Sequence, residues 1–280
     1  MDRQEEPRAN GFWAAITELV ADTAACVRFF SRLPLPALCR ADDPARLPDF
    51  AKISRAIPLA GWIVALPAVL LGLVLGFTAL PPLVTGFLVA GALAAVTGAL
   101  HEDGLSDLVD GFFGGHTPVR RLEIMKDSRI GAFGAIALVI STGVRASLIA
   151  ALLDRFSPLE AMTLLLGAES FSRMLIVWQW TILPSARPDG LGNKFGQPGR
   201  SAGPQACVIG AICLLPVVPT LYTTSLSITA LSLALLLATA SAYGIGILAK
   251  IKIGGFTGDV LGAVQQVSSL AFLIGCLSIP

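Results

Sequence analysis

Long uninterrupted apolar runs constrain this chain more than any other feature. Each is about 18 to 23 residues, the length at which an α-helix crosses the hydrocarbon core of a bilayer. Hydrophobic residues make up 54% of the chain and charged residues only 14%, against roughly 25% charged residues in soluble domains. A β-barrel is excluded because its strands alternate polar and apolar residues. We therefore predict an all-α fold, a polytopic integral membrane bundle of about seven transmembrane helices, at residues 57–78, 83–100, 131–153, 161–183, 205–222, 228–249 and 260–279.

Residues 1–56 precede the first predicted span and are treated as a separate N-terminal segment, cytoplasmic or interfacial. Within it, residues 11–33 place apolar side chains at helical spacing but also carry Glu18, Asp22 and Arg28. This pattern favours an amphipathic helix in the membrane interface over an eighth span. Residues 57–280 are predicted to form the transmembrane catalytic domain.

The distribution of positive charge predicts the orientation of the bundle. Lys and Arg outside the predicted spans concentrate in the N-terminal segment and in the loops after the second, fourth and sixth spans, and Arg155 is the exception. If the spans alternate, all these segments share one face, and positive loops face the cytoplasm. We predict a cytoplasmic N-terminus and an external C-terminus.

An acidic stretch, H-E-D-G-L-S-D-L-V-D-G over residues 101–111, follows the second apolar run. Charges beside a membrane span are costly and usually functional. Asp103, Asp107 and Asp110 are spaced i, i+4 and i+7, which places three carboxylates on one helix face. They repel one another unless a cation lies among them, and oxygen ligands suit Mg²⁺ better than Zn²⁺. We predict these three as metal-binding catalytic residues. His101 is either a general base or, more in keeping with its position, a hydrogen-bonded structural residue.

A second candidate segment follows the acidic stretch. Gly114 and Gly115 would let backbone amides approach a phosphate closely, although a flexible turn explains them equally well. Lys126 and Arg129 flank Asp127 just before the third span. We interpret the two basic residues as phosphate-binding and Asp127 as a further metal ligand.

A third candidate segment leads into the last span. Thr257 is suited to cap the helix N-terminus, and Asp259 falls in the first helical turn. Capping alone accounts for the pattern, but glycines before a helix N-terminus also form anion sites. Because the segment belongs to the same predicted face as the acidic stretch, we include Asp259 among the substrate-binding residues.

Three charged residues fall inside the predicted spans. Arg145 and Arg173 lie near the middle of theirs, and Glu169 is one helical turn before Arg173. Intramembrane arginines face the bundle interior and have partners. The sequence leaves two interpretations open: a structural ion pair, or a polar cavity that holds an anionic substrate.

Carboxylates, a metal and basic residues at one membrane surface are typical of phosphoryl transfer, in which charge on the transferred group must be neutralised. No phosphate-binding lysine loop of the nucleotide-hydrolase type is present in the sequence. We therefore predict an enzyme acting on a phosphate-bearing substrate at the cytoplasmic surface.

The sequence resembles the cobalamin synthase family of adenosylcobinamide-GDP ribazoletransferases over nearly its whole length. The resemblance rests on H-x-D-G-L-x-D-x-x-D-G at residues 101–111, R-L-E-I-M-K-D-S-R-I-G at residues 121–131 and T-G-D-V-L-G-A at residues 257–263. The middle motif is long and therefore specific. Glu102 stands where the family often has an apolar residue, which weakens any role for that position.

The resemblance implies a reaction. Adenosylcobinamide-GDP and α-ribazole, or its 5′-phosphate, would give adenosylcobalamin, or its 5′-phosphate, and GMP with Mg²⁺ in the bacterial inner membrane. The expected partners are these small molecules and the lipid bilayer, with no nucleic acid, and the oligomeric state stays open.

Two other functions are consistent with parts of this sequence. A CDP-alcohol phosphatidyltransferase also displaces a nucleoside monophosphate with metal-bound aspartates, but its D-x-x-D-G-x-x-A-R motif stops matching after Gly111. A cation transporter would carry acids near the middle of the bilayer, where Glu169 alone is found here.

Overall fold

The computed structural model describes residues 11–187, 190, 194–223 and 226–279. In this part of the chain the regular elements are helices, and the only β-type pairing is an isolated bridge between Ser185 and Phe256. The all-α prediction is confirmed. The polytopic prediction is confirmed as well, because several helices are long and apolar enough to cross a bilayer.

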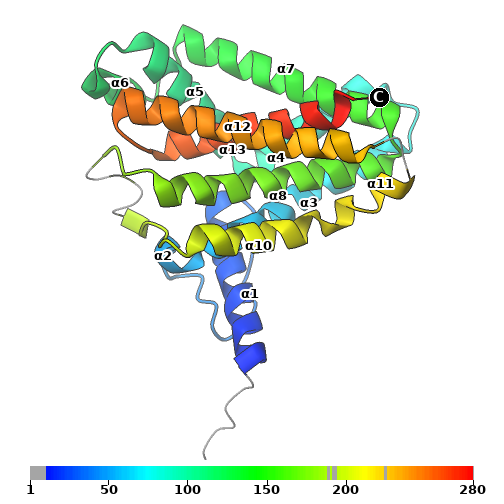
Figure 1. Cartoon of the computed structure of the whole chain (residues 1–280), viewed down its shortest axis with the longest axis horizontal. Coiled ribbons are helices and arrows are strands. Elements are labelled where there is room, and N and C mark those ends of the chain that lie inside the picture. Colours follow the sequence, from blue (N-terminus) through cyan, green and yellow to red (C-terminus); the bar gives the residue numbers. More distant parts are fainter. Residues whose placement is uncertain (1–10, 188–189, 191–193, 224–225, 280) are drawn as a thin grey trace, which may run out of the picture.

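Five helical segments meet that criterion of length and composition. Figure 1 shows the long helices running side by side, with α8 and α13 in the interior, where most of their residues are buried. Both helices also bury polar side chains, which are paired with one another inside the bundle. The segments are Phe50–Gly76, which includes α3 (Ile57–Gly76), and the helices α7 (Ala132–Arg155), α8 (Pro158–Ile182), α12 (Ile228–Ile253) and α13 (Gly258–Leu277).

The predicted second span is a broken helix. α4 (Pro82–Thr97) and α5 (Leu100–Gly114) together pass the same test but are bent by 90°. Between them Gly98 and Ala99 both have left-handed backbone, with φ of 64° and 57°. Two consecutive left-handed residues end a right-handed helix. The acidic stretch therefore belongs to a separate helix, and does not extend the preceding span.

The predicted fifth span is also shorter than expected. α10 (Ala202–Leu214) passes into the 3-10 turn η2 (Leu215–Val217), and the short helix α11 (Thr220–Thr223) follows. Pro216 and Pro219 lack the amide hydrogens that a continuous helix needs. The described chain thus has five membrane-length helices, or six with the α4–α5 pair, where the sequence predicted about seven.

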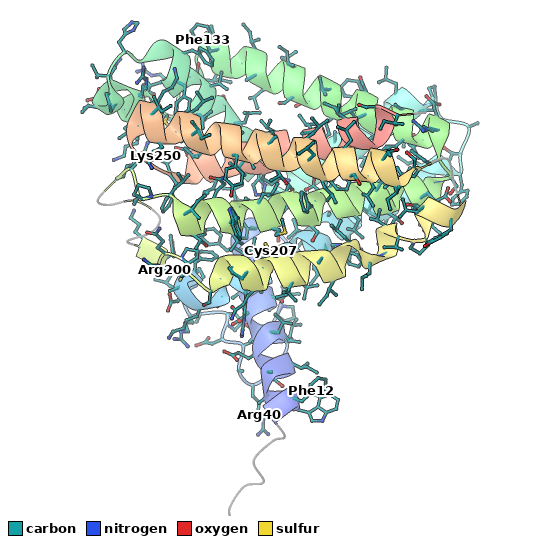
Figure 2. The ribbon with its side chains drawn as sticks, viewed as in Figure 1. Phe12, Arg40, Phe133, Arg200, Cys207 and Lys250 are labelled. Atoms are coloured by element: carbon teal, nitrogen blue, oxygen red, sulfur yellow. The ribbon has the colours of Figure 1, made fainter. Side chains whose placement is uncertain are left out.

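The N-terminal segment contains α1 (Gly11–Phe30), α2 (Phe50–Ile53) and the turn η1 (Ser54–Ala56). α1 is absent from the helices of membrane-spanning composition. Figure 1 shows it projecting across the direction of the long helices, and Figure 2 shows Phe12 at its far tip, away from the bundle. Phe12 and Trp13 are both exposed. This geometry favours the predicted interfacial helix over an eighth span.

The segments that the sequence indicates as candidate site segments lie at one end of the bundle. The C-terminal ends of α5 and α8, the short helix α6 (Pro118–Ile124) and the turn from α12 to α13 all lie at the left in Figure 1. Figure 2 places Lys250 and Arg200 at this end. The other end carries α11 and the C-terminus.

The interior contains one charged cluster. The Glu169 carboxylate accepts hydrogen bonds from Arg145 at 2.9 Å and from Arg173 at 2.6 Å. Gln265 and Ser269 of α13 complete its coordination, at 2.9 and 2.8 Å. Of the two interpretations left open by the sequence, the structure supports the ion pair, which joins α7, α8 and α13.

Candidate active site

α5 displays the three predicted aspartates at different depths. Asp103 is exposed, Asp107 is half-buried and Asp110 is buried. Asp110 lies against the start of α7, where its carboxylate accepts the amide hydrogens of Gly131 at 2.7 Å and Gly134 at 2.9 Å. It satisfies amides that the first turn of a helix leaves unpaired. Asp110 therefore caps the N-terminus of α7, and its carboxylate oxygens are already engaged there.

Close packing between α5 and α13 brings a fourth aspartate to the site. A Cβ added at Gly104 would lie 3.1 Å from the Asp259 carbonyl oxygen and 3.3 Å from the Gly262 Cα. Only glycine allows two backbones to approach so closely. As a result Asp259 approaches Asp107, which already has Asp103 and Asp110 as neighbours on α5. These three carboxylates repel the charge of Asp107, and Arg187 offsets that repulsion.

Asp259 is held from both sides. Thr257 caps α13, and its hydroxyl also donates to the Asp259 carboxylate at 3.2 Å. Arg187 approaches the same carboxylate at 3.9 Å. Arg187 reaches this point because the chain after α8 pairs with the chain before α13: Phe256 N–H donates to the Pro184 carbonyl at 2.8 Å, and Ala186 N–H to the Phe256 carbonyl at 2.9 Å.

Next to Asp259 is a hollow of about 350 Å³, here called the basic hollow, lined by Lys126, Arg187, Lys194, Phe256 and Asp259 among others. Three cationic side chains around one space attract an anion, and the guanidinium of arginine suits phosphate oxygens. The predicted phosphate-binding residue Lys126 is therefore joined here by two residues that the sequence had not singled out.

Asp127 and Arg129 lie in a different hollow, of about 310 Å³, which Asp110 and Gly114 also line. Arg129 donates to both carboxylate oxygens of Asp127, at 3.0 and 2.7 Å. These hydrogen bonds hold the pKa of Asp127 at about 2. Asp127 is thus ion-paired with Arg129. The structure does not bring it together with Asp103 and Asp107.

Gly115 is buried beneath Arg121, whose guanidinium donates to the Gly115 carbonyl at 3.0 Å. Its carbonyl is thereby engaged in joining α5 to α6, while the neighbouring Gly114 remains exposed. The roles of Gly114 and Gly115 in substrate binding stay predictions.

His101 is 3% exposed and lies at the start of α5 beside Phe30, with the two rings nearly parallel at 14° and their centroids 6.2 Å apart. It lines a cavity of about 190 Å³ together with Asp103 and Asp259. Its Nε2 atom has no hydrogen-bond partner within the described part of the chain. His101 is therefore close to the carboxylates, and its Nε2 atom does not make the hydrogen bond that the structural interpretation of this residue would use.

The carboxylates of α5 and α13 offer oxygen ligands for a divalent cation. In the described residues no three His, Cys, Asp or Glu side chains form a ready coordination group. The donors near Asp107 are nevertheless all carboxylates, and Mg²⁺ is commonly held by one or two carboxylates with substrate phosphates and water. The residues fit Mg²⁺ shared with a phosphate-bearing substrate, and do not fit an all-protein metal cage.

The sequence interpretation missed Arg187 and Lys194, which it had counted only as positive loop charges. It also missed the aromatic residues around His101, notably Phe30 and Trp180. Phe30 lies in the F-F-S-R-L-P segment at which the family resemblance begins, and no local motif marks the other three. The signal available was the concentration of basic residues on one predicted face, which indicated one end of the bundle but not the individual residues.

A membrane-embedded helical bundle whose carboxylates border a basic hollow at one end defines a class, the polytopic membrane enzyme acting on phosphate-bearing molecules. The comparisons with known proteins narrow the class. A model of the cobalamin-5-phosphate synthase family matches residues 22–277. The chain belongs to this family, and is a transferase of cobalamin biosynthesis.

Individual relatives agree with the family match. Proteins from Brucella canis and Brucella abortus named adenosylcobinamide-GDP ribazoletransferase are 48% identical over 261 residues, which cover 92% of this chain and 96% of each relative. The protein of that name from Brucella ovis is 47% identical over the same lengths. No solved structure gives a significant match. The resemblance seen in the sequence is confirmed, and it favours this activity over the phosphatidyltransferase and transporter alternatives.

Proposed function

We propose that this chain joins adenosylcobinamide-GDP to α-ribazole, or to its 5′-phosphate, and releases GMP. The product is adenosylcobalamin or its 5′-phosphate. The observation that carries the proposal is the position of Asp259, which lines the basic hollow and also lies near Asp107 of the acidic stretch. The names of relatives at 48% identity support the choice of substrates.

In this reaction a ribose hydroxyl attacks the phosphorus attached to cobinamide, the bond from that phosphorus to the GMP oxygen breaks, and GMP leaves. The basic hollow would hold the diphosphate, with Lys126, Arg187 and Lys194 offsetting charge on its oxygens. Exposed Asp103 and half-buried Asp259 both line the adjoining cavity, so either carboxylate is placed to accept the hydroxyl proton.

Mg²⁺ is proposed as the cofactor, with Asp103 and Asp107 as the protein ligands best placed to hold it against the diphosphate. When bound, it would neutralise charge on the phosphate oxygens and make GMP a better leaving group. Asp110 and Asp127, included in the metal set from the sequence, already bind the α7 amides and Arg129. We assign them supporting roles.

The proposed location is the bacterial inner membrane, with the site on the cytoplasmic side. The support is that the basic loops gather at the end of the bundle that carries the site. Positive loops stay in the cytoplasm during insertion.

The test uses purified protein in detergent or lipid nanodiscs, given adenosylcobinamide-GDP, α-ribazole and Mg²⁺, with GMP release followed. We expect turnover in the parent, its loss on chelation of the metal, and at least a roughly 100-fold lower kcat for Asp103→Asn and Asp107→Asn. Asp154→Asn is the matched control, since Asp154 is an exposed aspartate near the far end of α7. Undiminished turnover in both site variants would remove the carboxylate assignment, and transfer from a CDP-activated lipid instead would favour the phosphatidyltransferase alternative.

A further inference from the structure

The cavity that contains His101 is aromatic on its buried side and acidic on its open side. Phe29 and Phe30 of α1, His101 of α5 and Trp180 of α8 form its walls, and exposed Asp103 lies at its outer edge. Phe50 reinforces the wall, with its ring centroid 4.9 Å from those of both Phe29 and Trp180. These residues come from four separate helices, so the cavity exists only in the folded chain.

Two residues that line this cavity, His101 and Trp180, each have a side-chain nitrogen without a hydrogen-bond partner. In the described residues His101 Nε2 and Trp180 Nε1 are buried without a hydrogen bond, although buried polar groups are almost always paired. His101 is 3% exposed and Trp180 is 1% exposed. The indole N–H can only donate, and a neutral imidazole donates from one of its nitrogens. Both nitrogens are covered in this structure, so a ligand with a hydrogen-bond acceptor would satisfy either of them once the ring turned toward the cavity.

The volume and shape of the cavity suit a flat ring system. Its volume is about 190 Å³, and an apolar protein cavity of roughly 150 Å³ is enough to admit benzene. Aromatic walls favour offset stacking or edge-on contacts with a planar ligand. An anionic group would be disfavoured there, because Asp103 and Asp259 line the same cavity.

The cavity and the basic hollow meet at one residue pair. Gly258 and Asp259 line both spaces. A nucleoside whose base lies in the aromatic cavity would extend its sugar toward Asp103 and Asp259, and a diphosphate in the basic hollow would approach the same carboxylates from the other side. This is the arrangement that a transfer from diphosphate to a sugar hydroxyl requires.

We propose that the aromatic cavity binds the heteroaromatic base of the acceptor nucleoside, with His101 or Trp180 donating to its unsubstituted ring nitrogen. The inference rests on the proposed function, because the acceptor named in the relatives is a ribazole, whose base is a two-ring benzimidazole. One of the base's ring nitrogens is bonded to the sugar, and the other retains a lone pair as an acceptor. His101 is then a substrate-binding residue, in place of the general base considered from the sequence.

The test compares α-ribazole with an analogue in which the free ring nitrogen is replaced by CH. With the parent protein we expect the acceptor KM to rise roughly 10-fold or more for the analogue, which lacks the acceptor atom, while the KM for adenosylcobinamide-GDP stays the same. In His101→Phe or Trp180→Phe this preference should disappear, because the donor is gone. Phe77→Leu, an exposed aromatic at the end of α3, is the control and should keep the preference.

The outcomes separate the two proposals. If the parent turns over both acceptors with equal KM, or if both donor variants keep the full preference, the cavity assignment is overturned and the proposed function stands. If His101→Phe lowers kcat about 100-fold with an unchanged acceptor KM, His101 acts in proton transfer and the assignment also fails. Should one donor variant not fold, Phe30→Leu provides a second measurement: it removes a wall and is expected to raise the KM for α-ribazole only.

Discussion

Arg187 shows how much of this site depends on individual residues far apart in the sequence. It follows α8, yet it reaches Asp259 at 3.9 Å and donates to the Leu122 carbonyl at 3.0 Å. Arg129, chosen from the sequence, is 87% exposed at its side chain and is bound to Asp127. Both are arginines at the same end of the bundle, but only Arg187 lines the basic hollow. Substituting each in turn therefore distinguishes a role in the basic hollow from the effect of general positive charge.

We predict that Arg187→Ala raises the KM for adenosylcobinamide-GDP at least roughly 10-fold, because the variant loses a charge-assisted contact to phosphate. Arg129→Ala should change it about 2-fold or less. The measurement is steady-state GMP release with the donor varied and the acceptor saturating. Equal effects of the two substitutions would mean that the basic hollow is not the diphosphate site.

At the scale of elements, the break between α4 and α5 decides where the acidic face points. Gly98 and Ala99 turn the chain through 90°, and Arg32 packs against the turn, its amide donating to the Val96 carbonyl at 2.7 Å. A Cβ added at Gly98 would lie 2.5 Å from the Arg32 Nε atom. Ala99 adopts left-handed backbone without the freedom of glycine, so the two positions respond differently to substitution.

We expect Gly98→Ala to lower the free energy of unfolding by about 1–2 kcal/mol, since a side chain in left-handed backbone is strained. Ala99→Gly should be close to neutral, because the strain that it relieves is offset by the greater freedom of glycine in the unfolded chain. Thermal unfolding in detergent, with both variants and the parent compared, checks this order. A more stable Gly98→Ala protein would contradict the described turn.

For the whole molecule, the buried Arg145–Glu169–Arg173 cluster joins three helices inside the membrane bundle. All three side chains are almost fully buried, and the two arginines share a single carboxylate. Removing one partner of such a cluster leaves a buried charge uncompensated, which costs much more than losing an exposed ion pair. The cluster thus connects α7 and α8 to α13, which carries Asp259 at its start.

Glu169→Gln is predicted to destabilise the fold by roughly 3–5 kcal/mol. Glu123→Gln makes the same chemical change in an exposed pair with Arg120 and should cost about 1 kcal/mol or less. The midpoints of thermal unfolding of the two purified variants measure the difference. Similar midpoints would show that water or lipid headgroups reach Glu169 in the folded bundle.

The sequence by itself determined the helical membrane class and the family, and it predicted the end of the molecule at which we propose the site. The length of an apolar run and the charge of a loop are local properties, so they do not depend on how the helices pack against one another. The spacing of Asp103 and Asp107 on one helix face was also readable, because it depends only on the pitch of α5.

Only the tertiary structure decided which residues meet. Asp259, placed from the sequence among the substrate-binding residues, joins Asp103 and Asp107 because glycines of α5 and α13 let two distant helices touch. Asp127, only 17 residues beyond Asp110, is instead bound by Arg129. Arg187 and the cavity around His101 and Trp180 likewise depend on packing between helices remote in sequence. A periodic pattern specifies the face of one helix, whereas the partner of that face is set by the free energy of the whole packed bundle.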